Sequence, residues 1–337
     1  MAQMKFHPFY ERVADHYNWG AAGKVALSLA AGSVFFIPYF ILAGSDAFSD
    51  WSWLLAGLIS CALGFLFFAT ATLRSLLPRW ETFTGTDHVE KFMGPLTETL
   101  SDHRFLAAGL CTGGLNMLMG FCFGVPSADP AATLLLYFGF FLAGFFCGLP
   151  AYGIWGVLVT VNAFTRAAKK DQLDYTAPDR CGGIAFIGEA LVKFSVLTLF
   201  EGCLIATYIL KVSWTNGGDD WVQLLMWGWI VVPFLFSLLV LLSPAAKLNQ
   251  MLLDYRHTQE RILQDRCADL RRQIDGAGID DSQLEKLHNE YAYLAQRRED
   301  VFRMRTWPFG SGATTSFVGT FIANLVLASE LAEKLVG

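Results

Sequence analysis

Charged side chains are scarce in this sequence of 337 residues. Asp, Glu, Lys and Arg together make up 16% of the chain and apolar residues make up 54%, whereas soluble domains carry about 25% charged residues. The net charge is −5 and no basic face gathers the Lys and Arg residues, so the composition argues against binding to nucleic acid. A chain with so little charge is expected to have the lipid bilayer as its main partner.

Several catalytic signatures are also missing. The chain contains no GxxxxGK[ST], GxGxxG, HExxH or GxSxG pattern, and its His residues lack metal-ligand spacing. There is no CxxC pair, and Cys61, Cys111, Cys122, Cys147 and Cys203 lie inside apolar stretches, where Cys usually serves as a small packing residue. The sequence therefore predicts no enzyme, no cofactor and no metal site. Because the N-terminal residues lack the apolar core of a signal peptide, the first apolar stretch is expected to act as the insertion signal.

Long apolar stretches are what the sequence has in abundance. Each is near or above the ~20 residues that a helix needs to cross the ~30 Å hydrocarbon core. They cover 24–43, 52–73, 105–124, 132–163, 184–210 and 221–243. Lys and Arg alternate between the segments that join them, with Lys211 as the exception. By the positive-inside rule, the N-terminus and the region after 245 lie in the cytoplasm. The predicted fold is an all-α, polytopic membrane protein with six transmembrane helices.

The chain divides into four regions. Residues 1–22 are expected to form a cytoplasmic interfacial helix, because Phe6, Phe9, Val13 and Tyr17 share one helical stripe. The transmembrane domain covers 23–244, a cytoplasmic antiparallel helical hairpin covers 245–305, and a membrane-associated segment covers 306–337. The apolar positions within 312–332 suit either a seventh span or a re-entrant or interfacial helix.

The hairpin prediction rests on apolar residues at helical spacing on both sides of a break at 275–281. Two such helices bury little apolar surface by themselves, so their seam is expected to meet a second copy of the chain or another part of the same chain. We therefore predict a homo-oligomer. A cytoplasmic protein partner that binds 245–305 is the alternative.

Small residues recur every four positions in the third and fourth stretches, as Gly109xxxGly113 and Gly144xxxGly148. Such spacing permits close approach of helix backbones in a membrane. The pattern favours packing within the chain, and a subunit interface is the alternative.

The fifth stretch carries Glu189, Lys193 and Glu201. A charge inside the bilayer costs at least ~2.5–3.5 kcal/mol on insertion scales, so such residues rarely lack a role. Glu189 and Lys193 are four residues apart and are expected to neutralise one another. The deeper Glu201 either lines a hydrated path for protons or cations, or fastens the bundle as a protonated or paired side chain. Asn116 and Asn162 are weaker candidates for the path, and interhelical hydrogen bonding is their alternative role.

A loop motif precedes the fifth stretch and contains Pro178, Asp179, Gly182 and Gly183. Asp179 is placed to cap the following helix, and the glycine pair permits close backbone approach. This PD-x-x-GG stretch, together with RTWPF at 305–309, resembles segments of uncharacterised bacterial multi-pass membrane proteins. The resemblance implies a location in a bacterial inner membrane and carries no activity with it.

Three functions are compatible with these features. The first is an oligomeric inner-membrane channel that conducts ions, with the hairpin as its assembly or gating domain. The second is a membrane-anchored signalling, stress or defence component that acts through the hairpin. The third is a proton-coupled transporter of a small solute.

Overall fold

The computed structural model describes residues 8–84, 98, 101–123, 125, 129–167, 172–211, 220–276, 280–310, 312, 315, 317–322, 326 and 329. Every regular element within these ranges is a helix. Six of these helices are long and apolar enough to cross a membrane. They are α2 (Ala21–Ala43), α4 (Ser52–Thr84), α6 (Asp102–Phe123), α7 (Pro130–Ala167), α8 (Ala185–Lys211) and α9 (Asp220–Ile274). The prediction of an all-α, multi-pass membrane protein is confirmed.

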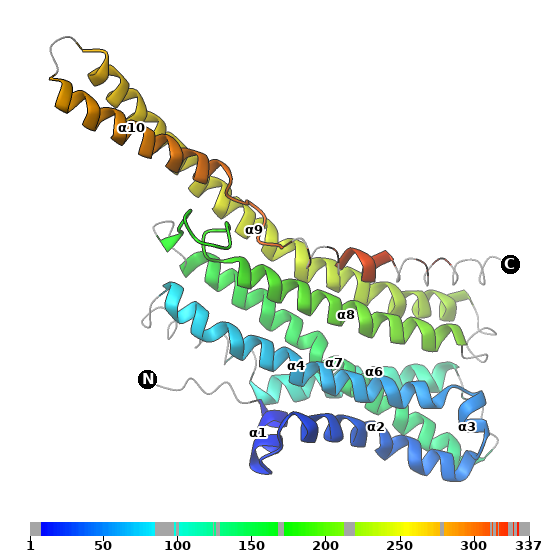
Figure 1. Cartoon of the computed structure of the whole chain (residues 1–337). Coiled ribbons are helices and arrows are strands. Elements are labelled where there is room, and N and C mark those ends of the chain that lie inside the picture. The colour runs from blue at the N-terminus through cyan, green and yellow to red at the C-terminus, as the bar shows by residue number, and fades with distance from the viewer. Residues whose placement is uncertain are drawn as a thin grey trace.

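Antiparallel helix pairs form the bundle (Figure 1). Helix α2 packs on α4, α6 on α7 and α8 on α9, while α4 and α7 also contact helices of the other pairs. One end of the bundle, here named the hairpin end, carries the short helix α1 (Phe9–His16). The opposite end carries α3 (Asp46–Ser49) and is named the α3 end. The basic residues Lys24 and Arg74 and the acidic residue Asp46 thus lie at opposite ends, as the charge alternation predicts.

A close helix contact joins α6 and α7 and uses the small residues that the sequence singles out. A methyl group on Gly144 would lie 2.6 Å from the carbonyl oxygen of Thr112, and one on Gly113 would lie 2.9 Å from the carbonyl oxygen of Phe141. Both distances are far below van der Waals contact, so only glycine lets the two backbones approach this closely. The glycine pattern therefore serves packing within the chain.

Helix α9 leaves the bundle without a break. It is 55 residues long, which corresponds to ~80 Å at 1.5 Å per residue. Inside the bundle it is joined to α8 by Ser195 and Ser237, whose hydroxyl oxygens are 2.6 Å apart and each of which donates to the other residue's carbonyl oxygen. The domain boundary expected at 244/245 therefore falls within one helix.

Beyond the bundle, α9 pairs with α10 (Asp281–Phe302) in the antiparallel hairpin that the sequence predicts (Figure 1). Leu263 and Leu270 of α9 pack against Leu294 and Val301 of α10. Tyr175, from the loop that precedes α8, packs on the same cluster. The seam thus meets another part of the chain, and self-association of the hairpin stays a prediction.

The two terminal regions differ in how much of them is described. Val13 of α1 and Tyr17, which follows the helix, are exposed as expected for an interfacial stripe, but Tyr10, Glu11 and Ala14 are buried against the bundle. Residues 317–322 are helical. Much of 312–332 lies outside the described residues, so its membrane crossing stays a prediction.

The α6–α7 contact generates a stability prediction. Gly144→Ala should lower the free energy of unfolding by about 1–3 kcal/mol, because the added methyl group meets the Thr112 carbonyl oxygen and forces the helices apart. Gly114→Ala is the matched control, since a methyl group there meets nothing within 4 Å. Thermal unfolding of the purified protein in detergent measures both. Equal melting temperatures for the two variants would contradict the proposed contact.

Candidate functional site

The candidate site is built around Glu201, which sits midway along α8. Its side chain is buried and lines two cavities, one of about 150 Å³ and one of about 80 Å³. Within the described part of the chain, its carboxylate oxygen Oε1 has no hydrogen-bond partner. A buried carboxylate without full pairing is costly, so its presence at this place marks a functional candidate.

Two thiols lie beside this carboxyl group. Cys147 of α7 is hydrogen-bonded to Glu201, and Cys61 of α4 lies close enough to Glu201 for an electrostatic interaction with its carboxyl group. Neither thiol supplies a positive charge. Glu201 thus faces a neutral, weakly polar wall on the sides of α4 and α7.

The larger cavity opens between α6, α7, α8 and α9. Its wall is mostly apolar and includes the aromatic rings of Phe140, Tyr208 and Trp229. Asn116 of α6 also lines it, but its amide donates to the carbonyl oxygen of Phe140 at 2.7 Å. Asn116 therefore bonds between helices, which is the alternative role considered for it.

The smaller cavity extends from Glu201 toward the hairpin end, where α1 covers it. Tyr10 of α1 and Thr70 of α4 both line it. Their hydroxyl oxygens are 2.7 Å apart, and Thr70 donates to the carbonyl oxygen of Leu66. Burial raises the pKa of the Tyr10 hydroxyl, so Tyr10 stays neutral and can donate to Thr70. The N-terminal helix thereby forms one wall of the cavity that reaches Glu201.

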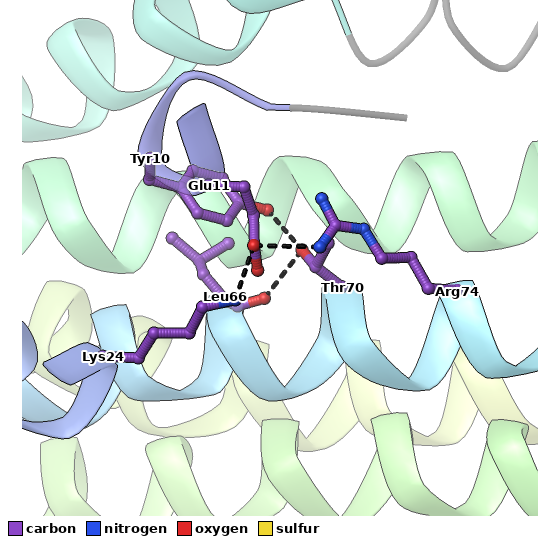
Figure 2. A network of polar contacts seen from close by, with 6 residues as sticks. All are labelled: Tyr10, Glu11, Lys24, Leu66, Thr70 and Arg74. Carbon is purple, nitrogen blue, oxygen red and sulfur yellow. Dashed lines mark hydrogen bonds and ion pairs between the residues drawn. The ribbon is translucent and has the colours of Figure 1, made fainter. Parts of the chain in front are cut away.

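An ion cluster holds α1 in this position (Figure 2). Glu11 is fully buried and its Oε2 lies 2.6 Å from Lys24 Nζ of α2 and 3.0 Å from Arg74 Nη1 of α4. On α6, Asp102 accepts the backbone N–H of Phe9 at 3.1 Å and pairs with Arg12. The N-terminal helix is thus bonded to three helices of the bundle.

The two motifs that carry the sequence resemblance meet in space. Arg305 N–H donates to the carbonyl oxygen of Arg180 at 2.7 Å, and the Cys181 thiol donates to the carbonyl oxygen of Trp307 at 3.5 Å. Burial, with Asp179 nearby, raises the pKa of Cys181 to about 12, so its thiol keeps the proton that it donates. We name the contact between 178–188 and 304–309 the loop joint.

Asp179 organises the start of α8 at the loop joint. Its carboxylate accepts the backbone N–H groups of Cys181, Gly183 and Ala185 at 2.8–3.0 Å. Gly182 and Gly183 both have positive φ, which favours glycine. Pro178 precedes this turn and its side chain is exposed. These residues are structural, and they fix the helix that carries Glu201.

The remaining sequence candidates lie away from the cavities. Glu189 and Lys193 are exposed on the outer face of α8, and no ion pair within 4.0 Å joins them among the described residues. Their expected mutual neutralisation is therefore not seen. Asn162 of α7 accepts a hydrogen bond from Lys247 Nζ of α9 at 2.6 Å and ties these helices together.

Sequence reasoning did not find the part played by Glu11, Tyr10 and Thr70. Glu11 does not lie on the apolar stripe of 1–22, and a charged side chain off such a stripe is normally solvated. The available signal was the short spacing between Glu11 and Lys24, which is not specific.

No family model, curated protein or solved structure matches this chain.

The ion cluster yields a prediction. Glu11→Gln should lower the free energy of unfolding by about 3 kcal/mol, because Lys24 and Arg74 then face each other without the buried counter-charge. Glu98→Gln is the control: its pair with Arg104 is exposed, so the expected cost is below about 1 kcal/mol. Chemical unfolding in detergent measures both. A Glu11→Gln protein as stable as the control would show that the cluster does not hold α1.

Proposed function

We propose that this protein moves protons across a bacterial inner membrane, coupled to a small solute, with Glu201 as the proton-carrying group. The observation that supports this proposal is that the Glu201 carboxyl group is buried between two cavities and has one oxygen without a hydrogen-bond partner among the described residues. An isolated carboxylate in an apolar setting is costly, so binding a proton or a cation is favourable at this position. A group that lines two cavities is suited to exchange its proton with either one.

The helices of one protomer are sufficient to line both cavities. Helices α4, α7, α8 and α9 surround Glu201, and α1 covers the cavity at the hairpin end. A path through this carboxyl group therefore runs inside a single protomer and needs no symmetric ring of subunits. This favours a carrier over an oligomeric pore.

The oligomeric ion channel stays the second candidate. Glu189 and Lys193 are exposed on the outer face of α8, where a second copy of the chain would cover them. The projecting hairpin (Figure 1) would contribute to such assembly, or would bind a cytoplasmic partner if the protein is a signalling component. A ring of four or more copies in detergent would favour the channel.

The proposed orientation places the hairpin end in the cytoplasm, as the distribution of Lys and Arg indicates. Asp46→Cys, introduced into a variant without the native cysteines, should react with a membrane-impermeant maleimide in intact cells, because Asp46 is exposed at the α3 end. Glu290→Cys on the exposed surface of α10 is the control and should react only after lysis. The reverse labelling pattern would invert the topology.

The proposed function predicts a loss of proton flux in Glu201→Gln. In liposomes with an internal pH dye, small organic solutes are added outside one at a time, and at least one of them should make the wild-type protein carry protons faster than empty liposomes do. Glu201→Gln should reduce the rate by about tenfold or more, because an amide does not release a proton. Glu189→Gln, an exposed change on the same helix, should keep the wild-type rate. Wild-type flux in Glu201→Gln would remove this residue from the mechanism.

A further inference from the structure

The larger cavity has chemistry that restricts what it can bind. Its lining includes four side chains whose hydrogen-bond donors are already engaged. The Thr112 and Thr198 hydroxyls donate to backbone carbonyls of their own helices, the Asn116 amide donates to Phe140, and the Trp229 indole N–H contacts the sulfur of Met119 at 2.7 Å. Glu201 lines the same cavity, and its oxygen Oε1 is buried without a hydrogen-bond partner among the described residues.

The charge of the wall has one sign. Among the described residues that line the cavity, none is Lys, Arg or His. The titratable groups that face Glu201 from the neighbouring helices are Cys61 of α4 and Cys147 of α7, and both are thiols. An anionic solute would therefore meet no positive partner here and would be repelled by an ionised Glu201.

The remaining surface of the cavity suits an organic cation with a hydrophobic body. Aromatic rings of Phe140, Tyr208 and Trp229 line the cavity, and the negative faces of aromatic rings attract organic cations. A hard metal ion is disfavoured, because Ca²⁺ takes about six to eight oxygen ligands and this wall offers one carboxyl group. The volume of about 150 Å³ matches an apolar cavity that accommodates a benzene-sized group.

We propose that the larger cavity binds a small hydrophobic monocation, with an ammonium group at Glu201 and an apolar, benzene-sized body among the aromatic rings. This cation would be the solute that the proposed proton carrier exchanges for protons, so the inference rests on the proposed function. A proton and the ammonium group compete for the same carboxylate, so the cation enters only when the proton has left. One positive charge replaces another, and the burial of net charge is avoided in both states.

The test uses the purified full-length protein in detergent and two probes of nearly the same shape, benzylammonium and neutral benzyl alcohol. Isothermal titration should show that the wild-type protein binds benzylammonium about tenfold or more tightly than benzyl alcohol, because only the cation pairs with Glu201. This comparison needs no variant. Equal affinities for the two probes would overturn the proposal.

Variants locate the site. Glu201→Gln should lower the benzylammonium affinity by about tenfold or more and leave that of benzyl alcohol unchanged, because the amide keeps the shape and loses the charge. Trp229→Leu should weaken benzylammonium binding, whereas Trp229→Phe, which keeps a ring face, should weaken it less. Glu189→Gln should bind as the wild type does. Unchanged benzylammonium affinity in both Glu201→Gln and Trp229→Leu would place the cation elsewhere and overturn the assignment.

The binding and flux measurements can contradict the cation site and the proposed function independently of one another. Proton flux that depends on Glu201, without preferential binding of benzylammonium, would overturn the cation site and keep the proposed function. Binding of benzylammonium at Glu201, without proton flux in liposomes, would keep the cation site and overturn the proposed function.

Discussion

The exclusion of water along six helices is the constraint on which the rest of the structure depends. In hydrocarbon, each polar group that lacks an internal partner costs several kcal/mol. The bundle meets this demand with pairs between helices, such as the reciprocal bonds of Ser195 and Ser237 and the amide bond from Asn116 to Phe140. Glu201, like Glu11 and Asn249, keeps one buried oxygen without a bond among the described residues, and it is set apart because it also lines both cavities.

The sequence predicts the helices well because lipid imposes a strong, local signal. The predicted stretch 105–124 corresponds to α6 (Asp102–Phe123), and 184–210 corresponds to α8 (Ala185–Lys211). Helical periodicity likewise predicts the hairpin. The division at 244/245 follows from a change in composition, yet backbone geometry can continue through such a change, and α9 does so.

The polar contacts could not be predicted in the same way, because they join residues far apart in the sequence. The burial of Glu11 depends on Arg74, which follows it by 63 residues, and nothing in the local pattern of 1–22 encodes that encounter. The two motifs of the loop joint were each visible, but their contact was not. Glu201 was found because a lone carboxylate in an apolar stretch is a local anomaly, whereas its position between two cavities follows from packing.

The docking of α1 has a consequence for the order of assembly. Helix α1 is synthesised before two of its partners, because Thr70 and Asp102 follow Tyr10 and Phe9 by 60 and 93 residues. At roughly 5–20 residues per second, the ribosome reaches Asp102 about 5–20 s after Phe9. During this interval the docking site of α1 is incomplete, because it lacks Asp102. Helix α1 therefore completes its bonds to the bundle only once α2, α4 and the start of α6 have been made.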